Sequence, residues 1–169
     1  NGEATDVGQA VDGDNGGEFT LNEDGSYSFD PNGDFDDLAD GETRTTSIEY
    51  QVSDGEGGFD TATLKITVTG VNDAPTVITA DVPADQSNAD HDTISPLNVS
   101  GAFTDVDSSD TLTYSATGLP AGLTIDAATG VISGTIDKSA SQGGTDGTYT
   151  VTVTASDGSA SANITRTDS

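Results

Sequence analysis

The sequence predicts an all-β protein built from two tandem cadherin/immunoglobulin-like β-sandwich modules, and three observations support this prediction. Short runs of alternating apolar and polar residues, rich in Thr, Val, Ile and Tyr, fill much of the 169-residue chain. Period-two runs of this kind are typical of half-buried antiparallel strands. Gly, Asp and Asn separate the runs, as turns require. No segment of helical length carries apolar residues at a 3.6-residue spacing, so helix is expected only as a turn or two near Phe35–Ala39.

The alternation also predicts which side chains share a face in each strand. The residues expected to share a face in their strands are Ile48, Tyr50, Val52, Leu64, Ile66 and Val68 in the first half, and Leu112, Tyr114, Tyr149, Val151, Val153, Ala155, Ala160, Ala162 and Ile164 in the second. Several short strands broken by regular turn signals favour a sandwich.

The two halves of the chain repeat one another. Tyr50-Gln-Val-Ser-Asp-Gly is followed by a return strand, and Tyr149-Thr-Val-Thr-Val-Thr-Ala-Ser-Asp-Gly is followed by another. The two Ser-Asp-Gly turns lie about one hundred positions apart, the length of one sandwich domain. Pro75 cannot donate a hydrogen bond to a β-ladder and therefore suits the start of a module. We expect one module at residues 1–74 and a second at residues 75–169.

Comparison of the repeats predicts that both modules are incomplete. Fewer residues precede Asp54 than lie between Asp73 and Asp157, so the first module is expected to lack its N-terminal strands. Few residues follow Asp157, so the second is expected to lack part of its last strand. The sequence shows no signal peptide and no apolar run near the roughly 20 residues of a membrane span. We therefore expect an internal fragment of a longer mature protein.

The charge balance restricts the classes of partner. Asp and Glu total 30 against 4 Lys and Arg, which gives a formal net charge of −26. A nucleic-acid site needs a basic surface, so nucleic acid is excluded as a partner. Anionic lipid surfaces are disfavoured for the same reason. Because the chain has no Cys, its stability must come from its core or from metal ions rather than from disulfides.

Two long segments resemble known bacterial families. Residues 17–42 (from Gly17-Glu-Phe-Thr-Leu-Asn) and the stretch ending in Val71-Asn-Asp-Ala-Pro75 resemble a VCBS-type repeat. Residues 76–169 resemble a dystroglycan-type cadherin-like module of immunoglobulin type, as in large repeats-in-toxin (RTX) adhesins. The matching motifs are Phe103-Thr-Asp-Val-Asp107, Leu112-Thr-Tyr-Ser-Ala-Thr-Gly-Leu-Pro-Ala-Gly-Leu123, Thr129-Gly-Val-Ile-Ser-Gly134 and Ala155-Ser-Asp-Gly158. The resemblance implies cadherin-like sandwiches, repeated many times and stiffened by calcium at their junctions.

The same resemblance implies a set of calcium ligands. By similarity to cadherins these are Asn72 and Asp73 of the linker, Asp105 and Asp107 of a D-x-D loop, Asp157, and Glu42 with its neighbour Asp40 in the preceding module. Calcium takes six to eight oxygen ligands. Carboxylates about 5 Å apart repel by about 3 kcal/mol per pair at an effective dielectric constant of 20, so their convergence calls for a cation. The alternative for each residue is a solvated turn. Ala74 stands where cadherins carry a second Asn, which leaves a third junction ion open.

Other motifs do not support a site. Asp12-Gly-Asp14-Asn-Gly-Gly-Glu18 is superficially similar to an EF-hand loop, but Gly16 occupies the position of a third ligand and no helices flank it. His91 is the only histidine, and no arrangement of nucleophile and base can be argued around it. We predict no catalytic residues, and no cofactor other than Ca²⁺.

The sequence thus predicts a non-enzymatic, calcium-rigidified extender in a large secreted or cell-surface bacterial adhesin. Such a protein would serve cell adhesion and biofilm formation by projecting a ligand-binding region. The expected partners are the adjacent modules of the same polypeptide, the chain is expected to be monomeric, and no direct membrane insertion is expected. The location is expected to be extracellular. Two alternatives remain open: a calcium-dependent glycan- or peptide-binding module, and an accessory module of a secreted hydrolase.

Overall fold

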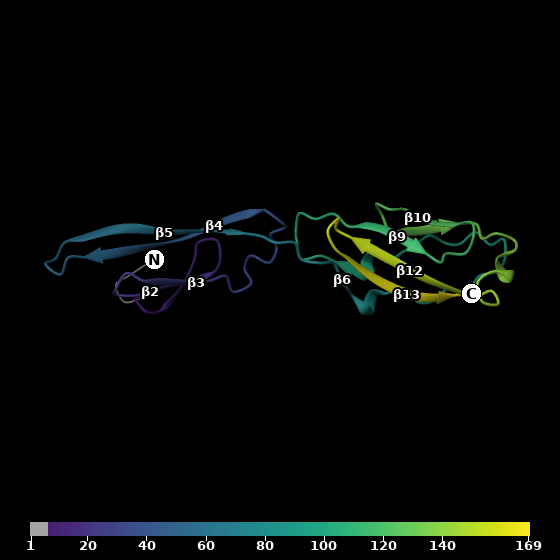
Figure 1. Cartoon of the computed structure of the whole chain (residues 1–169), viewed down its shortest axis with the longest axis horizontal. Helices are drawn as coiled ribbons and strands as arrows, with labels where there is room; N and C mark the ends of the chain where they lie inside the picture. Colours follow the sequence, from purple (N-terminus) through teal and green to yellow (C-terminus); the bar gives the residue numbers. More distant parts are fainter. Residues whose placement is uncertain (1–6) are drawn as a thin grey trace. The chain divides into compact units, whose positions relative to one another are not determined.

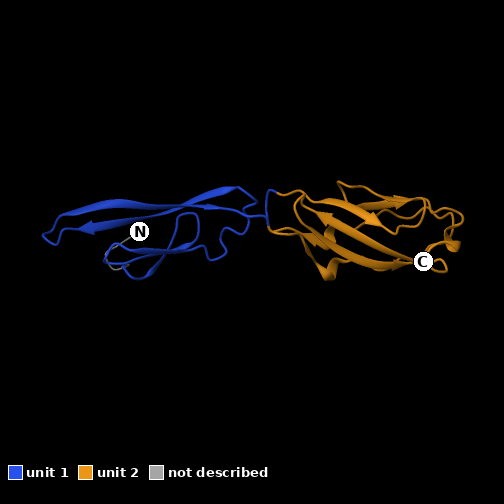
Figure 2. Cartoon of the chain, viewed as in Figure 1, with its two compact units in different colours: residues 1–72, 107–109 blue, residues 73–106, 110–169 orange. Residues whose placement is uncertain are grey.

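The computed structural model describes residues 7–169, which form an all-β protein (Figure 1). The chain divides into two compact units: Asn1–Asn72 with Asp107–Ser109, and Asp73–Val106 with Asp110–Ser169 (Figure 2). The first six residues of the predicted first module lie outside the described part. Residues 7–169 contain strands and three short 3₁₀ turns but no α-helix, so the predicted fold class is confirmed. The expected helical turn near Phe35–Ala39 is a succession of non-helical turns.

The first unit contains a three-stranded sheet and a long hairpin. The sheet has the order β1-β2-β3, formed by Ala10–Asp12, Glu18–Leu21 and Tyr27–Asp30. The hairpin joins β4 (Thr43–Ser53) to β5 (Phe59–Thr69), paired without interruption from Thr43↔Thr69 to Ser53↔Phe59. This pairing brings the alternating residues that the sequence predicted to share a face onto one face of the hairpin.

Aromatic rings form the core of the first unit. Phe19 is fully buried, and its ring centroid lies 4.8 Å from that of Phe29. The ring centroids of Phe29 and Phe35 lie 6.1 Å apart. The guanidinium carbon of Arg44 lies over the Phe35 ring, 5.7 Å from its centroid. Because such ring pairs and cation–π contacts add to simple area burial, a few large side chains can hold this small unit together.

The core covers only one half of the hairpin. The inward face of β4 is buried at Thr46 and Ile48, which are 0% and 9% exposed, whereas Val52 is 52% exposed. The hydroxyl of Thr46 donates to the carbonyl of Gly16 at 2.7 Å, and this bond ties the covered half of the hairpin to the loop before β2. Val52 shares a face with Ile48 but is left uncovered, because alternation identifies a face but not whether another layer covers it.

Asp14 ties the loop between β1 and β2 to the hairpin. One of its carboxylate oxygens accepts from the backbone N–H of Ser47 at 2.6 Å, and the other accepts from the Ser47 hydroxyl at 3.0 Å. These hydrogen bonds hold the pKa of Asp14 below its ordinary value of 3.8, and the bond from the backbone N–H of Ser47 contributes most. The loop that is superficially similar to an EF-hand loop therefore has a structural role: through Asp14 it holds the β1–β2 connection against β4.

Gly70 follows β5 and contacts the turn that precedes β4. Its N–H donates to the carbonyl of Glu42 at 2.8 Å, and its own carbonyl accepts from Gly41 at 3.2 Å. A Cβ placed on Gly70 would run into the backbone carbonyl oxygens of Leu38 and Ala39. Only glycine allows this close approach, which fixes the turn that carries Asp40 and Glu42.

The second unit is a sandwich of short strands. Its strands are β6 (Thr76–Val77), β7 (Leu97–Asn98), β8 (Phe103–Thr104), β9 (Thr113–Thr117), β10 (Leu123–Ile125), β11 (Val131–Gly134), β12 (Tyr149–Ser156) and β13 (Ser161–Asp168). One sheet has the order β13-β12-β9, a second has the order β10-β11-β7, and β6 pairs with β8. The 3₁₀ turns cover Thr79–Asp81, Ser100–Ala102 and Ala140–Gln142.

The core of the second unit follows the predicted alternation. Its buried residues are Val99, Ala102, Phe103, Ile132, Val151, Val153, Ala155 and Ile164. Every second residue of β12 from Val151 to Ala155 is fully buried, because this face of the strand packs on a core that also contains Phe103 and Ile132. β13 pairs with all eight residues of β12, from Tyr149↔Asp168 to Ser156↔Ser161.

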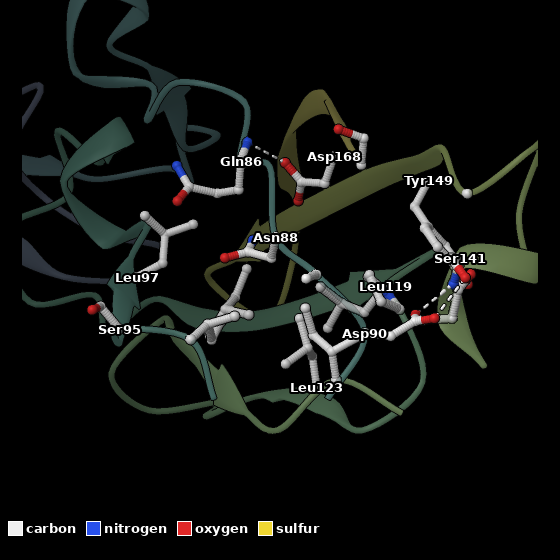
Figure 3. A pocket seen from close by; sticks show the side chains of 18 of the residues that line it. Gln86, Asn88, Asp90, Ser95, Leu97, Leu119, Leu123, Ser141, Tyr149 and Asp168 are labelled. Carbon is white, nitrogen blue, oxygen red and sulfur yellow. Dashed lines mark hydrogen bonds between the residues drawn. The ribbon is translucent and has the colours of Figure 1, made fainter. Parts of the chain in front are cut away.

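A pocket opens in the second unit, lined by aliphatic and polar side chains (Figure 3). Among residues 7–169 no helix has the length and apolar character needed to cross a bilayer.

Replacement of Gly70 by Ala should lower the free energy of unfolding of the first unit by about 1–3 kcal/mol, because the added methyl group overpacks a backbone contact. Scanning calorimetry of the full chain measures this change. Gly101→Ala is the control, since no atom of residues 7–169 lies within 4 Å of a Cβ placed on Gly101, its chain neighbours aside. Equal melting temperatures for Gly70→Ala and Gly101→Ala would contradict the contact.

Asp14→Asn should destabilise the first unit at neutral pH, and the difference from the unaltered chain should shrink in acid. The folded-state pKa of Asp14 is lowered, so the charged form contributes stability above pH 3.8 that is lost as the pH falls through the folded-state pKa. Denaturant titrations of both chains between pH 7 and pH 2 measure the difference directly. A difference that does not change with pH would show that the charge of Asp14 has no part in holding the β1–β2 connection against β4.

Candidate metal centre

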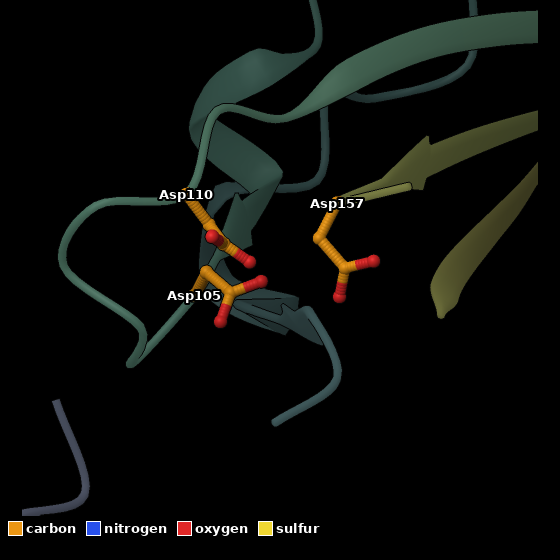
Figure 4. Close-up of side chains that lie close together, drawn as sticks. All are labelled: Asp105, Asp110 and Asp157. Atoms are coloured by element: carbon orange, nitrogen blue, oxygen red, sulfur yellow. The ribbon is translucent and has the colours of Figure 1, made fainter. Parts of the chain in front are cut away.

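Three carboxylates gather in the second unit (Figure 4). They belong to Asp105, Asp110 and Asp157, and one oxygen of each lies within 4.8 Å of the others. All three side chains are half-buried. Two ligands on opposite sides of a calcium ion, each 2.3–2.6 Å from it, lie about 4.6–5.2 Å apart. A single ion can therefore contact all three carboxylates with little movement.

Short strands place two of these carboxylates. Asp105 directly follows β8, whose residues pair with β6 at Thr76↔Thr104 and Val77↔Phe103. Phe103 is 6% exposed and anchors this end of β8 in the core. Asp157 follows β12, and its Oδ1 accepts from the N–H groups of Ser159 and Ala160 at 2.6 Å each. The turn after β12 thus holds the Asp157 carboxylate in place before any ion binds.

The donor set fits a hard divalent cation. Carboxylate oxygens suit Ca²⁺ and Mg²⁺ rather than softer metals. With their oxygens within 4.8 Å of one another, two of these carboxylates repel by about 3 kcal/mol at an effective dielectric constant of 20, and solvent lowers this repulsion for half-exposed groups. Three carboxylates supply at least three of the six to eight oxygens that calcium takes, so other groups or water must supply the rest.

The predicted ligands fall into both units. Asp40, Glu42, Asn72 and Asp107 belong to the first unit, whereas Asp73, Asp105 and Asp157 belong to the second. Of these seven residues, the cluster described above contains Asp105 and Asp157.

In the first unit, the predicted residues occupy a turn and two loop ends. The carboxylate of Glu42 accepts from the N–H of Ala39 at 3.2 Å, which places it against the turn that Gly70 contacts. Asp40 is exposed and Asn72 is half-buried. Asp107 is only 2% exposed. Next to it, the N–H and the hydroxyl of Ser108 both donate to the carbonyl of Asp37 at 3.1 Å. Asp73, in the second unit, is exposed.

Sequence reasoning missed Asp110. The resemblance to cadherins implies only the two aspartates of the D-x-D loop, Asp105 and Asp107, as ligands. A signal was present, because Asp110 lies in the same acidic stretch just ahead of the predicted strand that begins near Leu112. Which aspartates of such a loop converge depends on its backbone path.

His91 lies in the loop between the first 3₁₀ turn of the second unit and β7. It is exposed and has a left-handed backbone conformation with φ 68°. Its charge contributes to lowering the pKa of Asp137, after the hydrogen bonds from the side chain and the N–H of Ser139. This is the behaviour of a surface loop residue.

Comparison with solved structures confirms the sandwich architecture. Mouse cadherin-23 EC22-24 matches with a TM-score of 0.57 and 15% identity over 94% of this chain and 51% of that chain. Protocadherin gamma B2 extracellular cadherin domains 1-5 match with a TM-score of 0.51 and 16% identity over 90% of this chain and 30% of that chain. The protocadherin gamma B4 extracellular domain matches with a TM-score of 0.50 and 18% identity over 95% of this chain and 26% of that chain. The chain thus spans about half or less of each of these structures, and at these identities the likeness shows the fold alone.

Family models identify both parts of the chain, whereas no curated protein matches it. Residues 1–70 match the bacterial cadherin-like domain. Residues 74–168, more than half of the chain, match the model described as "Putative Ig domain". The predicted cadherin-like and immunoglobulin-like character is therefore confirmed, and domains of these kinds are typically non-enzymatic. The chain belongs to this immunoglobulin-like domain family, with a bacterial cadherin-like domain ahead of it.

Proposed function

We propose that this chain is a calcium-dependent structural extender of a bacterial cell-surface or secreted adhesin. The observation that carries the proposal is the cluster of Asp105, Asp110 and Asp157, whose oxygens lie at the spacing of ligands around one hard cation. The cadherin-like and immunoglobulin-like domains support an extracellular structural role.

The position of the cluster along the chain supports a role near the linker. Asp105 follows β8, and β8 pairs with β6, the first strand after Asp73–Pro75. An ion held there would be close in the chain topology to the residues that connect the modules. We include Asp73, Asn72 and Asp107, with Glu42 and Asp40 of the preceding module, as candidates for the remaining oxygens. Coordination by Asn72 and Asp73 of the linker would restrict the motion of the linker.

The charge of the chain gives the proposed switch its physical basis. Without a cation, the carboxylates of the cluster repel one another and oppose a fixed loop conformation. Extracellular calcium modules typically have dissociation constants of about 10⁻⁴–10⁻³ M. Such a site is empty at cytosolic calcium concentrations and filled outside the cell, so the modules would stiffen only after export.

The resemblance to VCBS-type repeats and RTX adhesins supports the finer proposal. In it, the chain is one stretch of a long repeat array, and the neighbouring modules of the same polypeptide are its partners. The array holds a distant ligand-binding region away from the cell, for adhesion and biofilm formation. Within this proposal the modules themselves act as monomeric spacers and catalyse no reaction.

Calcium should raise the melting temperature of the second unit more than magnesium does. Magnesium requires near-ideal octahedral geometry and keeps its water, so a cluster of flexible loop carboxylates discriminates against it. At 100 times the dissociation constant, a ligand stabilises the folded state by about 2.7 kcal/mol. Calorimetry of the full chain in calcium, magnesium and chelator tests this. Identical melting curves in all three solutions would refute the proposed function.

Asp110→Asn should have opposite effects with and without calcium. Removal of one charge from the cluster lowers calcium affinity by about tenfold or more, since ligand charge sets the affinity of such sites. In chelator the same substitution removes repulsion and should raise the melting temperature. Asp81→Asn, an exposed residue of the same unit outside the cluster, is the matched control. If calcium affinity were equal in both variants, Asp110 would not be a ligand.

Calcium should also narrow the range of particle dimensions in small-angle scattering. A linker restrained by an ion samples fewer conformations than one that holds repelling carboxylates. We expect a broad distance distribution in chelator and a narrow one in millimolar calcium. Asp107→Asn should keep the distribution broad in calcium, whereas Asp81→Asn should narrow it. A distribution that is the same in calcium and in chelator would leave calcium binding without the proposed mechanical role.

A further inference from the structure

The second unit contains a pocket of about 390 Å³ that the spacer function does not use (Figure 3). Its volume lies in the range of roughly 300–1,000 Å³ that small-molecule sites occupy. Its apolar lining comes from β7, β10, β11 and the connecting loops: Ile94, Leu97, Leu119, Leu123, Ile132 and Ile136. The pocket therefore lies against the core of this unit.

The burial of the lining residues distinguishes a floor from walls. Ile132 and Ile136 are 2% and 6% exposed and form the floor. Leu97, Leu119 and Leu123 are half-buried and form the walls. Protein interiors hold few voids larger than a water molecule. Aliphatic walls give water few hydrogen-bond partners, so an apolar guest gains more from this space than water does.

The rim of the pocket is held in place by the protein itself. The N–H of Asn88 donates to the carbonyl of Ser169 at 2.8 Å, and the N–H of Ser169 donates to the carbonyl of Gln86 at 3.0 Å. Further along the same loop, Asp90 accepts from the N–H and the hydroxyl of Ser141 at 2.7 and 2.6 Å. A guest would therefore not have to order this loop, and preorganisation of this kind favours binding.

The charged groups at the pocket are acidic. Asp90, Asp146 and Asp168 line it, and none of the lining residues described by the structure is Lys or Arg. Arg166 lies behind the lining and compensates Asp168 through an ion pair of 2.6 Å. Asp90 and Asp146 keep the rim negative. The ring of Tyr149 also lines the pocket, held by a hydrogen bond from its hydroxyl to the carbonyl of Ala140 at 2.8 Å. Aromatic faces attract cations.

We propose that this pocket binds a small hydrophobic amine, with the apolar body against Leu97, Leu123 and Ile132 and the ammonium group at the rim near Asp90, Asp146 and Tyr149. Anionic amphiphiles such as fatty acids are rejected, because the rim and the whole chain, with a net charge of −26, repel them. The site is separate from the carboxylate cluster and does not depend on calcium.

Three probes of equal shape test the proposal. 1-Adamantanamine, 1-adamantanol and 1-adamantanecarboxylate share one apolar cage and differ in charge at pH 7. The full chain, labelled with ¹⁵N, is titrated with each, and amide shifts are followed by NMR. The amine is expected to bind most tightly and the carboxylate most weakly, with shifts centred on residues 86–97, 119–123 and 132–149.

Two variants distinguish the contribution of the apolar cavity to amine binding from the contribution of the rim charge. Leu123→Trp fills the pocket and should abolish binding of the amine. Asp146→Asn removes one rim charge and should weaken the amine by up to about fivefold while leaving the alcohol unchanged. Asp146 has a left-handed backbone (φ 53°) that Asn also tolerates, so this variant should fold even if Leu123→Trp does not. Asp81→Asn is again the matched control, with the same loss of charge away from the pocket.

Four outcomes would overturn the proposal. These are equal binding of all three probes, no saturation by the amine, shifts that lie outside the pocket, and equal amine affinity in Asp146→Asn and Asp81→Asn. Sedimentation of the chain with and without the amine tests whether a second copy of the chain occupies the pocket instead. Self-association that the amine reverses would show that a second copy of the chain, and not a small molecule, fills the pocket.

Discussion

Hydrogen bonds from backbone N–H groups to aspartate side chains are the interaction on which this fold depends. Asp54, Asp126 and Asp137 each accept N–H groups of the turn that follows them. These hydrogen bonds lower the pKa of all three carboxyl groups. For Asp126 and Asp137 the largest contribution comes from the hydroxyl groups of Thr129 and Ser139, and backbone N–H groups contribute less. For Asp54 the largest contribution comes from the N–H of Glu56, followed by that of Gly58. Carboxylates of this kind stabilise the turns only while they are charged, so a chain with a net charge of −26 uses part of that charge to define its own loops.

Local patterns in the sequence were enough to predict the strands but not the layers. Val151, Val153 and Ala155, which alternate in the sequence, are buried in the structure. Alternate residues of any strand point to the same face, so the sequence alone is enough to predict this pattern. The exposure of Val52 and the hydrogen bonds between Asp14 and Ser47 depend on segments that meet only in the folded unit. The convergence of Asp110 with Asp105 and Asp157 is of the same kind, since it depends on a loop path that no local pattern specifies.

Arg166 shows how far tertiary context can override composition. It is one of four Lys and Arg residues in the chain, yet its side chain is 1% exposed within β13. It donates to Asp168 from Nε and Nη2 and to the carbonyl of Ala84 at 3.1 Å, while Nη1 is buried and has no hydrogen-bond partner among residues 7–169. A buried ion pair gains little net stability after desolvation. Its geometric effect is clearer, because it fixes the end of β13 against the segment that leads into the rim of the pocket.

Strand β12 connects the two candidate sites of the second unit. Its first residue, Tyr149, lines the pocket, and Asp157 of the carboxylate cluster directly follows its last. Eight residues at about 3.4 Å each separate the two by roughly 27 Å, and the intervening inward side chains are fully buried in the core. Because such a packed strand resists displacement, we expect an ion at one end and a guest at the other to bind without coupling. The spacer role and the binding role would then be independent properties of one sandwich, joined only by the strand that positions both.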